Sequence, residues 1–171
     1  PVLGRKEVMA DYIEDLQIAN IIVNSSLYRG YNGGNIQIID PTTKKTVGYI
    51  STGRTTALAF GPDGLLYRGY NGGNIQIIDP TTKKTVGYIS TGRTTALAFG
   101  PDGLLYRGYN GGNIQIIDPT TKKTVGYIST GRTTALAFQN KRTGQESLVT
   151  INLTLRTKNQ YGKDRQFKKK D

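Results

Sequence analysis

The chain has 171 residues, of which 36% are hydrophobic and 22 are glycine, and its formal net charge is +11. This length suits one domain of ordinary size. The chain contains neither cysteine nor histidine, which excludes disulfides, thiolate or imidazole metal ligands and histidine-based catalytic triads. Composition therefore predicts a protein that is not an enzyme and that holds no metal or cofactor. No apolar run reaches 18 residues, so no transmembrane segment is expected.

Residues 1–26 form a segment with a sequence of its own. The apolar residues of Arg5–Gln17 recur at helical spacing, with acidic residues between them, and this pattern predicts an amphipathic helix. Ile18–Val23 follows, and its β-branched residues predict a strand. Nothing in this segment or elsewhere in the sequence assigns a cellular location.

A tandem repeat of 39 residues fills residues 27–138. Residues 27–65 recur without one change at 66–104, and residues 105–138 repeat their first 34 positions. A period of this length indicates a solenoid, a propeller or an array. Surface positions normally drift, because most surface substitutions cost little. Three unchanged copies therefore indicate a recently amplified or an engineered repeat protein, and we favour engineering.

Each repeat predicts four short strands joined by tight turns. Gly-Pro-Asp-Gly at 61–64 and Asn-Gly-Gly at 71–73 are turn signals, and Pro80 must end the strand before it. The aspartates of these turns are expected to bond their own backbone. The result is an antiparallel meander, whose strands over one period are Thr55–Phe60, Leu65–Tyr70, Asn74–Asp79 and Thr85–Ser90.

The repeat resembles the blade of YVTN-type and NHL-type β-propellers. The resemblance covers about two thirds of the chain and rests on Leu66-Tyr67, Asn71-Gly72-Gly73, Ile77-Ile78-Asp79-Pro80 and Ala57–Phe60 with the Gly61–Gly64 turn. It implies an all-β propeller of four-stranded antiparallel blades, three per chain, with TTALAF as the innermost strand of a blade. It also implies binding or scaffolding rather than catalysis. Blades of the WD-repeat kind are less similar, because the sequence has neither tryptophan nor histidine.

Residues 139–171 form a second unique segment. Leu148–Arg156 alternates apolar and polar residues and predicts a strand, in the place where a fourth blade would have its second strand. The rest is a basic tail that ends in Lys168-Lys169-Lys170-Asp171. Such a tail either stays solvated or binds a polyanion, and we favour the solvated tail.

Three blades cannot close a ring, because known propellers have about four to eight blades. We therefore expect the chain to be completed by oligomerisation, as a non-enzymatic self-assembling scaffold. A closed homodimer is favoured, and a filament with non-closing contacts comes second. A monomer closed by its flanks comes last, although Ile18–Ile21 lies one period before Ala57–Phe60 and can supply an inner strand to the first blade.

One arginine of each repeat, Arg68 with its copies Arg29 and Arg107, lies within a strand expected to be covered on both faces. A buried guanidinium needs a carboxylate or carbonyl partner. An aspartate of the same or the adjacent blade is the expected partner.

A second arginine of each repeat lies in a turn. In a propeller, the turn that enters the innermost strand shares one face with the turn between the second and third strands. This predicts a ring of arginines at the channel mouth with tyrosines beside it, where an anion would bind. An anion- or nucleic-acid-binding module is therefore the alternative function, with candidate site residues Arg54, Arg93, Arg132, Tyr31, Tyr70 and Tyr109.

Overall fold

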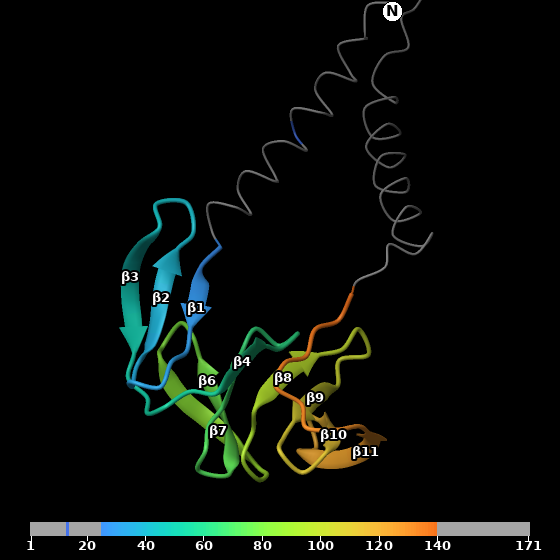
Figure 1. Ribbon diagram of the computed structural model, residues 1–171. Coiled ribbons are helices and arrows are strands. Elements are labelled where there is room, and N and C mark those ends of the chain that lie inside the picture. Colours follow the sequence, from blue (N-terminus) through green and yellow to red (C-terminus); the bar gives the residue numbers. More distant parts are fainter. Residues whose placement is uncertain (1–12, 14–24, 140–171) are drawn as a thin grey trace, which may run out of the picture. The chain divides into compact units, whose positions relative to one another are not determined.

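A computed structural model describes residue 13 and residues 25–139 of the chain (Figure 1). The elements predicted in 1–24 and in 140–171 lie outside these residues, apart from Ile13, which is helical. No helix in the described part of the chain is long and apolar enough to cross a membrane.

The described residues form antiparallel sheets, which confirms the all-β prediction. The first sheet has the order β1-β2-β3, the second β4-β5-β6-β7, and the third β11-β10-β9-β8 (Figure 1). The strands are β1 (Leu27–Arg29), β2 (Ile36–Asp40), β3 (Lys45–Ile50), β4 (Ala57–Phe60), β5 (Leu66–Gly69), β6 (Asn74–Asp79), β7 (Lys84–Ser90), β8 (Ala96–Phe99), β9 (Leu105–Gly108), β10 (Asn113–Asp118) and β11 (Lys123–Ser129).

Within each four-stranded sheet the strands follow one another in sequence order, as the meander predicts. Strand β6 has its predicted bounds, whereas β4 begins two residues later than predicted. The pairing of β6 with β7 shifts between Ile77 and Ile78, so that Ile77 lies opposite Gly87 and Ile78 opposite Thr85. Val86 is therefore the extra residue of a β-bulge in the outermost strand. A bulge bends such an edge and disfavours pairing with another chain.

The aspartate before each proline holds its own turn together. Asp79 accepts hydrogen bonds from the backbone N–H of Thr81 at 2.8 Å and from the hydroxyl of Thr82 at 2.9 Å. These two hydrogen bonds lower the pKa of Asp79, and the bond from Thr81 has the larger effect. Lys83 then adopts a left-handed conformation with φ of 60°. The predicted structural role of this aspartate is confirmed.

The aspartate of the Gly-Pro-Asp-Gly turn also bonds its own loop. Asp63 accepts the backbone N–H of Leu65 at 3.1 Å and the phenol O–H of Tyr67 at 2.8 Å. Burial, together with this bond, raises the pKa of Tyr67 well above its usual value. Both aspartates of the repeat are thus committed to turns.

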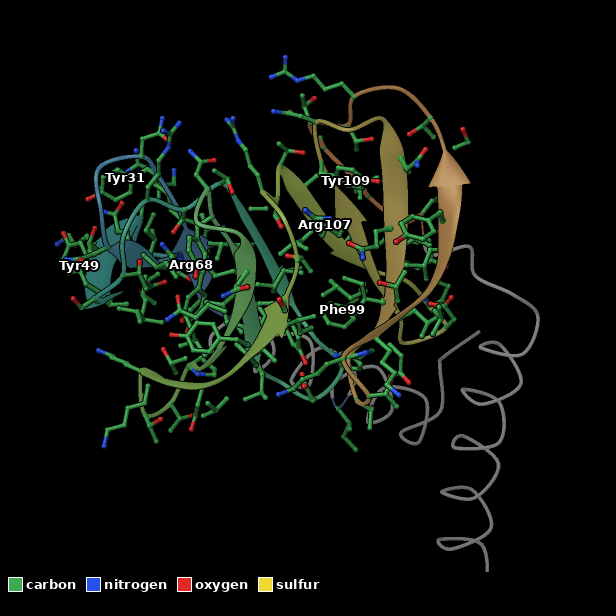
Figure 2. The ribbon with its side chains drawn as sticks, turned by 90° about the horizontal axis from the view of Figure 1, so that it is seen from below. Tyr31, Tyr49, Arg68, Phe99, Arg107 and Tyr109 are labelled. Atoms are coloured by element: carbon green, nitrogen blue, oxygen red, sulfur yellow. The ribbon has the colours of Figure 1, made fainter. Side chains whose placement is uncertain are left out.

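The hydrophobic core lies between consecutive sheets. Isoleucines of one sheet pack against residues of the next, and the rings of Tyr67 and Phe99 pack in a T-shaped arrangement at a centroid distance of 4.9 Å (Phe99 is labelled in Figure 2). The same set recurs one period later. The first interface buries Ile36, Ile38, Ile50, Leu66 and Ile78, and the second buries Ile75, Ile77, Ile89, Leu105 and Ile117.

The two ends of the described sheet series differ from its interior. Strand β1 pairs only with β2 among the described residues, so the first sheet has no inner strand there. The third copy of the inner-strand sequence, Ala135–Phe138, is not part of a strand. The prediction of a strand at every copy is wrong at this one, because a β-strand needs a neighbour for its backbone hydrogen bonds and no described sheet follows it.

Candidate functional site

A pocket forms on both the second and the third sheet, beside the turn that enters the inner strand. The pocket of the second sheet has a volume of 330 Å³ and that of the third sheet 390 Å³. Their linings use equivalent repeat positions. The first is lined mainly by Arg54, Arg68, Tyr70, Gln76 and Tyr88, and the second by Arg93, Arg107, Tyr109, Gln115 and Tyr127.

Arg68 is the buried element of its pocket, with only 5% of its surface exposed. It donates through Nε to Thr55 Oγ1 at 2.9 Å and through Nη1 to Gln76 Oε1 at 2.7 Å. It also donates through Nη2 to the backbone carbonyl of Arg54 at 2.8 Å, and its guanidinium stacks on the Tyr70 ring at 4.6 Å. Arg107 repeats these contacts (Figure 2).

The predicted aspartate partner of Arg68 is wrong. All its recorded hydrogen-bond partners are uncharged oxygen atoms. The sheet register explains the difference, because Arg68 of β5 lies directly opposite Gln76 of β6. Gln76 in turn donates from Nε2 to Thr85 Oγ1 at 2.6 Å, which fixes its amide with the oxygen toward the arginine.

The electrostatics of the pocket favour anions. Burial lowers the pKa of Arg68, and the nearby Tyr70 and Tyr88 oppose this shift. The lining holds a second guanidinium, that of Arg54, and no carboxylate. A guanidinium has five N–H donors, and three of those of Arg68 are used in hydrogen bonds to residues of the described part of the chain. Two arginines and two phenols can together bind a phosphate or carboxylate group.

The structure brings together some of the predicted ring residues. Arg54 and Tyr70 line one pocket, and Arg93 and Tyr109 line the other. Arg54 also donates from Nε to Asn32 Oδ1 at 2.9 Å, so the two turns predicted to share a face do meet.

The remaining ring residues lie elsewhere. Tyr31 stacks under Arg29 at 4.8 Å, and Arg132 lines neither pocket. The ring around a channel stays a prediction. Arg68, Gln76 and Tyr88 line the pocket of the second sheet although no sequence pattern predicted them there. Pairing the predicted strands residue by residue would have aligned Arg68 with Gln76.

No cluster of acidic residues that could hold a metal ion occurs among residues 25–139. That the chain is not an enzyme and needs no cofactor stays a prediction.

No protein-family model matches the sequence, and a search of curated proteins finds no match. Solved structures do match. The hydrazine synthase of Kuenenia stuttgartiensis superposes with a TM-score of 0.56 at 22% identity, over 67% of this chain and 36% of that one. The WD40 repeats of RRP9 give a TM-score of 0.53 at 15% identity, over 63% and 36%. U3-55K gives 0.53 at 14% identity, over 63% and 37%.

The chain is therefore an all-β protein whose antiparallel sheets are blade-like units of the β-propeller kind. At these identities the similarity shows the fold, and fold alone does not define function. The chain spans a little over a third of the length of these solved structures.

Proposed function

We propose that the chain is a non-enzymatic, self-assembling β-propeller scaffold, with YVTN/NHL-type blades in a recently amplified or engineered repeat. One observation carries this proposal. Residues that are buried at both internal sheet interfaces are half-buried or exposed at the two ends of the series, although they occupy equivalent positions of the repeat.

The third sheet presents a trailing face, made of Ile114, Ile116 and Ile128. Ile128 is 44% exposed, whereas its copies Ile50 and Ile89 are each 1% exposed. The first sheet presents a leading face, made of Leu27 and Ile39. Leu27 is 55% exposed, whereas its copy Leu66 is 1% exposed. Exposed apolar faces of this kind mark interaction sites or aggregation hazards.

The partner that fits both faces is a second copy of the chain. Within the chain, Ile36, Ile38 and Ile50 already pack against Leu66 and Ile78. A trailing face on the leading face of another copy would repeat this interface. Two chains would then close a ring of six repeat-derived blades, within the usual range, and we favour this homodimer. The same contact without closure gives a filament.

Ile128→Glu and Leu27→Glu test this assembly, because each places a charge in one of the two faces. We expect the parent chain to form a dimer of twice 18.7 kDa, whereas each variant should be a folded monomer by native mass spectrometry. Burying an unpaired charge in an apolar interface is strongly unfavourable.

The matched control is Val125→Glu, because Val125 is 57% exposed in the same strand and its copy Val86 is 55% exposed inside the series. This variant should assemble like the parent. A parent chain that stays a folded monomer at micromolar concentration would refute the proposal.

A second function, an anion-binding module, is favoured by the repeated pocket with its two arginines. The basic repeats attract polyanions, and the pocket of Arg54 and Arg68 supplies donors without a competing carboxylate. A ligand that binds only the folded chain stabilises it.

We expect inorganic triphosphate to raise the melting temperature of the parent chain by several degrees. Replacing all three turn arginines, Arg54, Arg93 and Arg132, by glutamine should abolish the rise. The control replaces the same number of charges at the start of the outermost strands, Lys45, Lys84 and Lys123, and should retain it. Differential scanning calorimetry makes the measurement, and an equal rise in both variants would contradict a site in the pocket.

A further inference from the structure

We infer that the segment Ala135–Phe138 of one chain pairs with β1 of a second copy and supplies the inner strand of its first sheet. This inference rests on the proposed self-assembly and names its structural mechanism. Each inner-strand sequence ends one repeat but pairs with the sheet of the next, as β4 does with β5 and β8 with β9. In the described part of the chain, the third copy of the inner-strand sequence has no following sheet to pair with, and β1 has no inner strand beside it.

The segment already has the contacts that an inner strand makes with the preceding sheet. Phe138 and Tyr106 form a T-shaped ring contact at 4.8 Å, as Phe99 and Tyr67 do at 4.9 Å. The backbone carbonyl of Thr133 accepts a hydrogen bond from the Thr95 hydroxyl. The segment is therefore positioned on one side and unpaired on the other.

The polar groups at the two ends are complementary. Arg68 donates to the Thr55 hydroxyl and the Arg54 carbonyl, which both precede its inner strand. Within residues 25–139, Arg29, its copy in β1, donates a side-chain hydrogen bond only to Gln37, at 3.0 Å, besides its stacking on Tyr31.

The copies of the two acceptors, the Thr133 hydroxyl and the Arg132 carbonyl, lie directly before Ala135–Phe138. Pairing between chains would bring Arg29 of one copy to both. It would also build a third pocket, with Arg132 from one chain and Arg29 and Tyr31 from the other.

The register of the pairing follows from the internal copies. Phe60 lies opposite Leu66 and Leu58 opposite Arg68. Phe138 and Leu27 occupy the same repeat positions as Phe60 and Leu66, so Phe138 of one chain should lie opposite Leu27 of the other. Both side chains are exposed at present, at 42% and 55%.

Disulfide trapping tests this register, because the chain has no cysteine of its own and only Cα atoms about 4.4–6.8 Å apart are readily bridged. Leu27→Cys chains and Phe138→Cys chains are refolded together, oxidised mildly and measured by non-reducing mass spectrometry. We expect a cross-linked heterodimer as the main product. The control pairs Phe138→Cys with Val125→Cys, which is equally exposed but out of register, and should cross-link at least tenfold less.

Two outcomes would overturn the inference. Native mass spectrometry of the same samples shows whether the chains are dimers or monomers, and so distinguishes these outcomes from a failure of self-assembly. Dimers without the 27–138 cross-link would mean that another segment, such as 18–21 of the same chain, occupies the edge of β1, and the scaffold proposal would stand. Equal cross-linking in the control would show that the register is unspecific. Monomers without the cross-link would remove both proposals.

Discussion

Ile89→Ala should lower the free energy of unfolding by about 2–5 kcal/mol, as truncation of a fully buried isoleucine does. Ile89 lies in the core between the second and third sheets and is 1% exposed. The same change at Ile128, one repeat later, should cost less than about 1 kcal/mol, because partly exposed positions lose little packing. Since the flanking repeat sequence is the same, the difference between the two variants measures the neighbouring sheet alone.

Urea denaturation followed by circular dichroism makes this comparison, at a chain concentration low enough to keep the parent monomeric. At high concentration Ile128→Ala should also weaken assembly directly, because Ile128 lies in the trailing face. Ile89→Ala should affect assembly only by destabilising the folded chain. Equal losses of stability at low concentration would show that the trailing face is packed in the single chain, contrary to its exposure.

The strands were predictable from the sequence because their ends are chemically marked. Pro80 cannot donate a ladder hydrogen bond, and Asn71-Gly72-Gly73 supplies a tight hairpin turn with Gly73 at φ of 98°. The unpaired state of Ala135–Phe138 was not predictable from the repeat itself. Its sequence equals that of β4, and only the absence of a following described sheet distinguishes the two.

The candidate site was predictable only in part, for the same reason. The position of Arg54 in a turn beside Asn32 follows from the propeller resemblance, and the hydrogen bond between them confirms it. The partners of Arg68 depend instead on which residue lies across the sheet. Charge favoured an aspartate, but Asp63 and Asp79 are committed to their turns, and the register places Gln76 opposite the arginine.

Gly69→Ala should lower the free energy of unfolding by about 1–3 kcal/mol, the usual cost of overpacking. A Cβ at this position would lie 2.5 Å from Thr94 Cγ2 and 2.8 Å from Thr94 Cβ. Thr94 is fully buried and cannot give way. Its hydroxyl accepts a hydrogen bond from Arg107 Nε at 3.0 Å, and its carbonyl accepts one from the Thr56 hydroxyl at 2.6 Å. The new methyl would therefore force the second and third sheets apart.

The matched variant is Gly108→Ala, at the same repeat position beside Thr133. Its Cβ would approach Thr133 Cγ2 to 2.7 Å, but Thr133 is only half-buried, and no arginine of residues 25–139 donates to its hydroxyl. Thr133 can move, so the loss of stability should be clearly smaller than at Gly69.

Gly131→Ala, with open space around it, should be neutral or gain a few tenths of a kcal/mol of stability from a stiffer unfolded chain. Urea midpoints of dilute samples give this order, and a Gly108→Ala loss as large as that of Gly69→Ala would show that Thr133 is held as rigidly as Thr94. If the two chains exchange strands, Gly108→Ala should in addition raise the dissociation constant of the dimer, because Arg29 of the second copy then fixes Thr133.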